Sequence, residues 1–182
     1  MVVLINGSFG VGKSTVARLL RAALPGSVVY DPEWVGLVLM RMGRPLRLAG
    51  SGTDDFQDMP LWRRSVGAGT RLIGRLASGP VIVPMTFSSR NYFDEVVSDL
   101  RSRGAISAFC LRASLGTIEK RLEDRNLVPT ARGNIWIRRR IRECVEAHHD
   151  PHFGEPIDTE NRSAQVVADD ILQRLNGMSD TL

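Results

Sequence analysis

Small residues, one lysine and one serine stand at phosphate-binding spacing near the start of the chain. The stretch INGSFGVGKST, residues 5–15, contains Gly7, four further residues and then Gly12-Lys13-Ser14, which is the spacing GxxxxGK[ST]. Glycines let backbone N–H groups turn toward a phosphate, the lysine can reach the terminal phosphates, and the serine hydroxyl can ligate Mg²⁺. A glycine-rich corner between a strand and a helix is the alternative, but an apolar run before the motif and a helix-like segment after it favour nucleotide binding. The loop residues expected to bind ATP are Gly7, Ser8, Phe9, Gly10, Val11, Gly12, Lys13, Ser14 and Thr15.

An acidic residue follows the second apolar run, in the stretch VVYDPEW, residues 28–34. Asp31, directly after a parallel strand, would lie at the carboxyl edge of the sheet, where open α/β folds bind ligands. There its carboxylate could orient or deprotonate an acceptor hydroxyl, or support Mg²⁺ together with Ser14. Asp-Pro-Glu is also a good helix start with Asp31 as the cap, and both roles can coexist. Asp31 is therefore a candidate for catalysis, acceptor binding and metal support.

Arginines surround a link containing Pro and Gly late in the chain, from Arg121 to Arg142. Arginines of a closing lid can offset the charge on a transferring phosphoryl group, so we predict a lid over about residues 121–140. Arg121 and Arg125 are four residues apart on one helix face and are the expected nucleotide contacts, and Arg125 is a catalytic candidate beside Lys13. A solvated basic helix face is the alternative for the other arginines. Nucleic acid is not an expected partner, because no interleaved aromatic pattern or known reader motif accompanies the basic residues.

Short apolar runs that alternate with helix-like segments must position these residues. The runs cover residues 2–5, 27–30, 80–85, 105–111 and, more weakly, 155–157. Strands alternating with helices predict right-handed crossovers and a parallel sheet covered on both faces. The expected fold class is a single α/β domain, a P-loop three-layer α/β/α sandwich with a five-stranded parallel sheet. Residues 33–78 exceed a simple crossover, and we interpret them as a helical insertion that binds the acceptor.

Length, composition and charge agree with one soluble domain. The chain has 182 residues, of which 43% are hydrophobic and 24% charged, enough for one domain with a buried core. The net charge of +4, carried by 22 arginines and two lysines, suits a phosphate-rich small ligand as well as nucleic acid. The two cysteines indicate no disulfide framework, and no apolar segment is long enough to span a membrane. A cytoplasmic protein without an integral membrane segment is expected.

A polar segment with aromatic residues lies inside the expected insertion. DDFQDMPLWRR, residues 54–64, combines three acids, two aromatics and two arginines, and its composition indicates a segment too polar for the core. Such a mixture suits contact with a polar organic molecule through stacking and hydrogen bonds. A surface loop anchored by Phe56 and Trp62 fits the composition equally well.

Five stretches, in the same order and over nearly the whole chain, resemble the TmrB-type tunicamycin-resistance proteins: INGSFGVGKST, VVYDPEWVG, DDFQDMPLWR, VIVPMT and IDTEN. That family is similar in build to small P-loop kinases, with a nucleoside-monophosphate-kinase-like fold. The resemblance implies ATP and Mg²⁺ binding and protection against a nucleoside antibiotic by phosphorylation. It also implies that Thr159 lies near the adenine. The acceptor site that it implies consists of Asp31, Asp55, Phe56, Gln57, Trp62, Arg63 and Thr86.

One departure from the kinase pattern concerns Mg²⁺. The run VIVPM, residues 81–85, ends without the aspartate of a Walker B motif, so the ion would depend on Ser14, Asp31, phosphates and water. A second metal hypothesis concerns HHDPH, residues 148–152, whose histidines could hold Zn²⁺, although a loop is the simpler interpretation.

These patterns predict an ATP-dependent phosphotransferase that acts on a hydroxyl of a small polar molecule, with a tunicamycin-like nucleoside as leading acceptor. Two other functions remain open at this stage. One is an ATP-binding protein that sequesters the antibiotic without modifying it, and the other is a regulatory ATPase with a protein partner. A phosphate-binding loop indicates what is bound and leaves open where the phosphate goes.

Overall fold

The computed structural model describes residues 1–43, 55–102, 104–125 and 131–179. Five strands form one sheet in the spatial order β2-β3-β1-β4-β5, and every neighbouring pair is parallel. The expected α/β sandwich around a five-stranded parallel sheet is confirmed. The strands are β1 (Val2–Gly7), β2 (Val28–Val29), β3 (Val81–Met85), β4 (Ile106–Arg112) and β5 (Glu155–Asp158).

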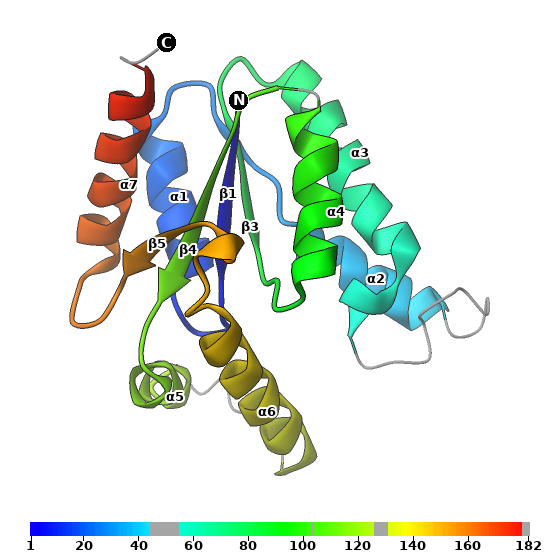
Figure 1. Ribbon diagram of the computed structural model, residues 1–182, viewed down its shortest axis with the longest axis vertical. Helices are drawn as coiled ribbons and strands as arrows, with labels where there is room; N and C mark the ends of the chain where they lie inside the picture. Colours follow the sequence, from blue (N-terminus) through cyan, green and yellow to red (C-terminus); the bar gives the residue numbers. More distant parts are fainter. Residues whose placement is uncertain (44–54, 103, 126–130, 180–182) are drawn as a thin grey trace.

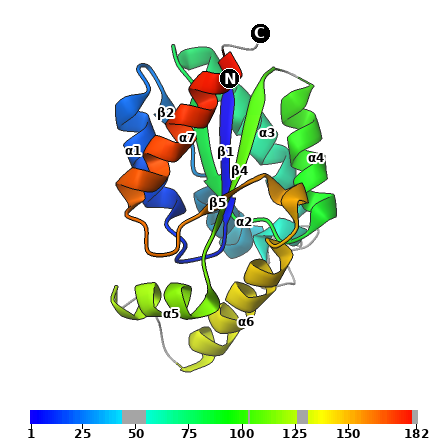
Figure 2. The same ribbon diagram turned by 60° about the vertical axis from the view of Figure 1, so that its left-hand side comes forward.

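Helices cover both faces of this sheet (Figure 1). One face carries α1 (Lys13–Ala23) and α7 (Ala164–Ser179), and the other carries α3 (Pro60–Leu76) and α4 (Arg90–Arg101). The helix α2 (Pro32–Gly43) packs beside α3, and the short 3-10 helices are η1 (Phe56–Asp58) and η2 (Pro151–Phe153). Beyond the carboxyl ends of the strands lie α5 (Leu115–Glu123) and α6 (Ala131–Ala147), as the turned view also shows (Figure 2). The start of α2 and these two helices therefore lie at the edge of the sheet where open α/β folds bind ligands.

The central strand β1 explains why the sheet has two apolar cores. Its side chains alternate between the faces, and both faces are covered, so the strand is apolar from Val2 to Ile5. Val3 and Ile5 pack on the side of α1 and α7, whereas Leu4 packs on the side of α3 and α4. Leu4 stands beside Val83 of β3 and Ala108 of β4 in the register of the sheet.

The helix α3 belongs to the core, in contrast to the expectation from the composition of residues 54–64. Met59, Trp62 and Val66 are completely buried and pack against the sheet. Their spacing of three and four residues places them on one helical face, while charged residues occupy the other. The average polarity of residues 54–64 does not show that the apolar residues lie on one face. The helix α3 is amphipathic and forms part of the crossover between β2 and β3.

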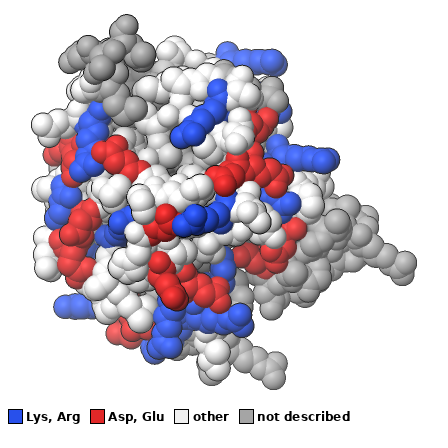
Figure 3. All heavy atoms as spheres, in the orientation of Figure 1, with Lys and Arg blue, Asp and Glu red and all other residues white. Residues whose placement is uncertain are grey.

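The surface mixes basic and acidic side chains, and basic ones gather over the end of the molecule formed by α5 and α6 (Figure 3). Among the helices in the described ranges, none has both the length and the apolarity that crossing a bilayer requires.

Candidate active site

The loop between β1 and α1 has the backbone of an anion cradle. Gly10 and Gly12 have φ angles of +78° and +114°, a region that favours glycine, and α1 begins at Lys13. A Cβ at Gly10 would meet Leu122 at 2.9 Å, whereas one at Gly12 would meet nothing within 4 Å. Space is thus open beside the Gly12 backbone, at the N-terminus of a helix whose free N–H groups and dipole attract an anion.

Lys13 lies inside this loop with only 7% of its surface exposed. Its Nζ donates to the carbonyl oxygens of Gly7 and Ser8, at 3.0 Å each, and lies 5.6 Å from the centre of the Phe9 ring. An ammonium group has three donors, so these two bonds leave one for a phosphate oxygen. The loop therefore orients the lysine toward the space that a phosphate would fill.

Two adjoining hollows run along the loop, with volumes of about 330 Å³ and about 110 Å³. Gly12, Thr15 and Arg125 line both of them, so Arg125 stands where the two meet. The larger hollow is also lined by Phe9, Gly10, Lys13, Ser14, Asp31, Glu33, Pro84, Leu122 and Ile137. The smaller is also lined by Val11, Val16, Arg121, Thr159, Arg162, Ala164 and Val167.

Two carboxylates at the start of α2 line the larger hollow across from the loop. Asp31 Oδ1 accepts a hydrogen bond from the Glu33 N–H at 3.0 Å, which is the expected cap of this helix. Burial raises the pKa of Asp31 above its ordinary value, and the Glu33 charge raises it further. The Glu33 N–H and the Lys13 charge act in the opposite direction. Asp31 thus caps the helix and also faces the phosphate loop.

Glu33 is a site residue that the sequence analysis did not select. The Thr86 hydroxyl donates to Glu33 Oε1 at 3.0 Å, and Thr86 is 1% exposed directly after β3. The position after β3, which lacks a Walker B aspartate, therefore holds a carboxylate that comes from α2. An acid two residues after Asp31, in the first turn of the same helix, was the signal that could have indicated it.

The oxygen ligands around the larger hollow suit Mg²⁺. Ser14 supplies a hydroxyl, and Asp31 and Glu33 supply carboxylates, all hard donors of the kind that Mg²⁺ prefers. In the part of the chain that the structure describes, no group of three or more His, Cys, Asp or Glu side chains could hold a metal. These residues fit an ion that is bound jointly with nucleotide phosphates.

Arg121 connects the phosphate loop to the segment after β5. Its guanidinium donates to the Val11 carbonyl at 3.2 Å, to Thr159 Oγ1 at 3.1 Å and to the Thr159 carbonyl at 2.7 Å. Thr159 in turn donates through its N–H and its hydroxyl to the Arg112 carbonyl of β4. Arg121 and Thr159 thus stand together at the smaller hollow, and their contact with a nucleotide stays a prediction.

The predicted lid is described only in part. Residues 126–130 lie outside the described residues, as does the side chain of Arg132, and α6 begins at Ala131. Ile137 of α6 lines the larger hollow, so the helix after the lid segment borders the site.

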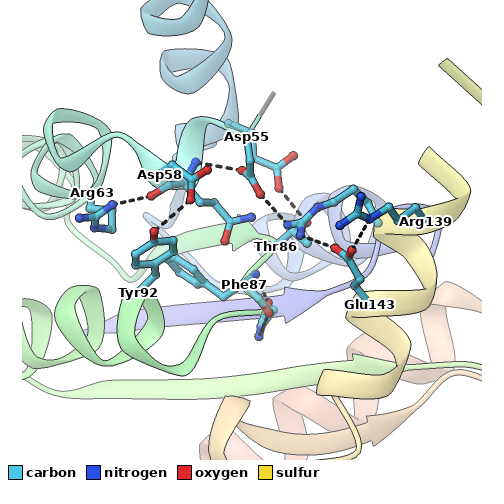
Figure 4. Close-up of polar contacts among 12 residues, drawn as sticks. Asp55, Asp58, Arg63, Thr86, Phe87, Tyr92, Arg139 and Glu143 are labelled. Carbon is cyan, nitrogen blue, oxygen red and sulfur yellow. Dashed lines mark hydrogen bonds and ion pairs between the residues drawn. The ribbon is translucent and has the colours of Figure 1, made fainter. Parts of the chain in front are cut away.

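The structure separates the residues that the resemblance assigned to the acceptor. Asp55 pairs with Arg140 of α6 at 2.7 Å, next to Glu143, on one side of the close-up in Figure 4. Trp62 is completely buried, its ring centre 4.8 Å from that of Phe56, and its Nε1 donates to the Pro32 carbonyl at 2.8 Å. Trp62 therefore has no surface with which an acceptor could make contact in this conformation.

Arg63 and Gln57, on the other side of the close-up, take part in contacts that link α3, α4 and η1. Arg63 donates to Glu95 Oε2 at 2.6 Å and to the Gln57 carbonyl, and its guanidinium lies 4.3 Å from the centre of the Tyr92 ring. The Tyr92 hydroxyl donates to Asp58 at 3.0 Å, and Figure 4 shows the three residues Arg63, Tyr92 and Asp58 together. These bonds join α3 to α4 and hold η1 in place.

The three histidines of HHDPH point to different partners. His148 is buried and its Nε2 lies 2.7 Å from the Phe87 carbonyl oxygen, His149 is exposed, and His152 Nε2 pairs with Asp94 at 2.7 Å. The three histidine side chains, although close in sequence, therefore do not point toward one common site.

Comparisons with known proteins agree with this geometry. A family model described as an AAA domain matches residues 2–142. The structure is similar to the tunicamycin resistance protein of Deinococcus radiodurans, at 28% identity and a TM-score of 0.72, over 96% of this chain and 95% of that one. The resemblance inferred from the sequence motifs is thus confirmed. A search of curated proteins finds no match.

Two kinases share the fold at lower identity. One is a gluconokinase from Sinorhizobium meliloti 1021, at 18% identity and a TM-score of 0.62, with 98% of this chain and 97% of that one covered. The other is a shikimate kinase from Acinetobacter baumannii in complex with shikimate, at 17% identity and a TM-score of 0.58, with 100% and 94% covered. The fold is that of small P-loop kinases.

Proposed function

Because this chain belongs to the AAA domain family and has a small-molecule-kinase-like P-loop fold, we propose that it is an ATP-dependent phosphotransferase acting on a hydroxyl of a small polar molecule. The observation that most directly supports this proposal is that Asp31 and Glu33 line the same hollow as Gly12, Lys13 and Ser14. A phosphate loop facing carboxylates provides both halves of a phosphoryl transfer, namely a place for the phosphates and a group to receive the hydroxyl proton.

The leading acceptor is a tunicamycin-like nucleoside. The Deinococcus radiodurans tunicamycin resistance protein supports this choice, because it matches nearly the whole chain at 28% identity. Transfer of a phosphate to such an antibiotic, with ATP supplied in the cytoplasm, would confer resistance.

Each charged residue of the hollow has a role in this proposal. Lys13 and Arg125 contact the phosphates and offset the charge that develops during transfer. Mg²⁺, when bound near Ser14 with the phosphates, neutralises further charge on the same oxygens. Asp31 takes the proton of the acceptor hydroxyl, whose oxygen bonds to the γ-phosphorus while the bond to the bridging oxygen of ADP breaks. Its raised pKa suits this role, since a base works best with a pKa near the working pH.

Glu33 is proposed to support the same step. Its bond from Thr86 fixes the carboxylate at the carboxyl edge of the sheet, where it can hold Mg²⁺ directly or through water. Arg121 and Thr159 are proposed to lie beside the nucleotide base, and residues 121–140 to close over the phosphates and exclude water.

Mass spectrometry of tunicamycin after incubation with the protein and Mg-ATP tests the proposal. The wild-type protein is expected to add one phosphoryl group, Lys13→Ala is expected to add none, and Asp31→Asn should lower kcat by about 10²–10⁴-fold. Asp169→Asn, an exposed acid on α7, is the matched control and should act as the wild type does.

Two results would contradict a kinase acting on tunicamycin. Saturable binding of an antibiotic that stays unmodified would identify a sequestering protein. Hydrolysis of ATP that ignores the antibiotic and rises with a protein partner would identify a regulatory ATPase.

A further inference from the structure

A further hollow lies beyond the ends of β4 and β5, between the start of α5 and the end of α6, two helices that Figure 2 shows beyond the sheet. Its volume is about 500 Å³, which exceeds that of either hollow along the phosphate loop. None of its lining residues lines those two hollows, so it is a separate space. The two helices contribute apolar side chains to its wall, among them Leu115, Ile118 and Val145, and the ends of β1 and β4 contribute Ser8 and Arg112.

The hydroxyl of Ser8 has no partner at this wall. Ser8 directly follows β1, and only 1% of its surface is exposed. Its carbonyl accepts a hydrogen bond from Lys13 at 3.0 Å, whereas its Oγ is buried and bonds to none of the described residues. Native proteins rarely leave a buried hydroxyl unpaired, because the lost bonds to water are then not replaced. Ser8 therefore serves the phosphate loop through its backbone and leaves its hydroxyl for another ligand.

Arg112, the last residue of β4, lacks partners on two of its nitrogens. Its Nε and Nη2 are buried and form no hydrogen bond with a described residue, and no described carboxylate pairs with the guanidinium. The Cys110 thiol lies near enough for the Arg112 charge and a hydrogen bond to oppose the rise of its pKa, but a thiol is a weak acceptor and supplies no counter-charge. Charges taken out of water are normally paired in proteins. This guanidinium therefore lacks its counter-ion.

These unpaired donors come from neighbouring positions of the sheet. The register places Gly7 of β1 beside Leu111 of β4, so the next residues, Ser8 and Arg112, follow side by side. The buried His148 lines the same hollow, and the charges of Lys13 and Arg112 both lower its pKa. Positive charge therefore accumulates on this side of the hollow.

The carboxylates of the hollow stand on its other side, at the end of β5. Asp158 Oδ1 accepts the Glu160 N–H at 2.8 Å. Glu160 accepts the N–H of Ser114 at 2.8 Å and the hydroxyls of Ser114 and Thr117. Both acids are thus bonded to their own loop and to the start of α5, and neither pairs with Arg112. A ligand with one negative group is therefore attracted to the side of Arg112 and repelled from the side of β5.

We propose that this hollow binds a small organic carboxylate with an apolar body, and that Arg112 is its counter-ion. The Nε–Nη2 edge of a guanidinium holds two N–H groups in parallel, which matches the two oxygens of a carboxylate. Rotation about the side-chain bonds of Arg112 turns this edge to the hollow, and the Ser8 hydroxyl donates to the same carboxylate. The apolar body packs on Leu115, Ile118 and Val145. The protein thus has a second ligand site, separate from the hollows beside Lys13.

Calorimetry with 4-phenylbutyrate and 4-phenylbutanamide, which differ in charge and are alike in shape, tests this site without ATP. The wild-type protein is expected to bind the carboxylate about tenfold or more tightly than the amide, because only the carboxylate pairs with Arg112. Arg112→Met should lose this preference, and Arg112→Lys, which keeps the charge without the two-nitrogen edge, should retain part of it. Arg142→Met is the matched control: Arg142 is exposed on α6 and does not line the hollow, so this variant should bind as the wild type does.

Urea unfolding separates a ligand site from a structural role of Arg112. Without ligand, Arg112→Met should be at least as stable as the wild type, because the substitution removes a charge that has no carboxylate partner. With saturating 4-phenylbutyrate, the wild type should gain stability and Arg112→Met should not. A structural ion pair would give the opposite result, with a less stable variant in the absence of ligand.

Four results would overturn the proposal. They are equal binding of the two probes by the wild type, binding of neither, a preference that survives in Arg112→Met, and a ligand-free Arg112→Met that is less stable than the wild type. Binding of neither would assign internal water as the partner of the unpaired groups. A crystal structure with 4-phenylbutyrate should place its carboxylate within hydrogen-bond distance of Arg112. These measurements do not involve turnover, so a failure to phosphorylate tunicamycin would contradict the proposed function and leave this inference standing.

Discussion

Protonation of one buried histidine should contribute to the loss of stability of this protein in acid. His148 is 2% exposed, and its Nε2 lies 2.7 Å from the Phe87 carbonyl oxygen, which holds the segment after β3. Burial lowers its pKa from about 6.5 to about 4, and the Lys13 and Arg112 charges contribute, while the bond to Phe87 opposes the shift. The unfolded chain therefore binds a proton between about pH 6.5 and 4 that the folded protein does not.

The sign and the size of the effect follow from this difference. Because the unfolded state binds more protons in this window, the free energy of unfolding falls as the pH decreases from about 6.5 to 4. A shift of one pKa unit corresponds to about 1.4 kcal/mol, so the full loss is about 3 kcal/mol, most of it reached by pH 4.5. That is a large part of the stability of an ordinary domain.

Urea unfolding of the wild type, His148→Gln and His149→Gln at pH 7.5 and pH 4.5 measures this loss. Gln can donate to the Phe87 carbonyl but does not titrate, so His148→Gln should lose about 2–3 kcal/mol less than the wild type between the two pH values. His149, the exposed neighbour, is the control and should leave the wild-type pH dependence unchanged. The carboxyls with raised pKa, Asp31 and Asp55, act in the opposite direction, and those with lowered pKa, such as Asp170, act in the same direction. Both kinds are present in all three proteins, so their effects cancel in the comparison. Equal pH dependence of His148→Gln and the wild type would refute the reasoning.

Two further predictions concern the phosphate loop and the thiols. Gly10→Ala should weaken ATP binding by about tenfold or more and cost about 1–3 kcal/mol, because φ is +78° and the new Cβ would meet Leu122 at 2.9 Å. Titration with ATP measures the binding, and urea unfolding measures the stability. Gly116→Ala in α5, where a Cβ meets nothing within 4 Å, is the control and should bind ATP as the wild type does. Unchanged ATP binding by Gly10→Ala would contradict the proposed geometry of the loop. Burial raises the pKa of Cys110 and of Cys144 to about 11, so both should stay unreactive toward a thiol reagent at pH 8 until urea unfolds the chain. Rapid labelling of the native protein would show that these thiols are accessible.

Features that depend on neighbours in the chain could be predicted from the sequence. The phosphate loop is a run of consecutive residues between a strand and a helix, so its spacing alone indicates its backbone shape and its ligand. The position of Asp31 was predictable for the same reason. Because it directly follows a strand and precedes a helix, it was expected to cap that helix and to lie at the carboxyl edge of the sheet. The parallel sheet followed from the alternation of apolar runs with helix-like segments, which leaves few possible topologies.

Features that depend on pairs of distant side chains required the tertiary structure. Trp62 is buried because it lies on the apolar face of α3. The mean polarity of its segment does not indicate which face of the helix is buried. Glu33 lines the hollow and accepts a hydrogen bond from Thr86, and Asp55 pairs with Arg140; in each pair the two residues are more than 50 positions apart in the sequence. Local sequence determines backbone geometry within an element, but only packing determines which charge meets which. The sequence by itself therefore indicated a phosphate-binding loop, while the arrangement of helices around the sheet decided which carboxylates line the hollow beside it.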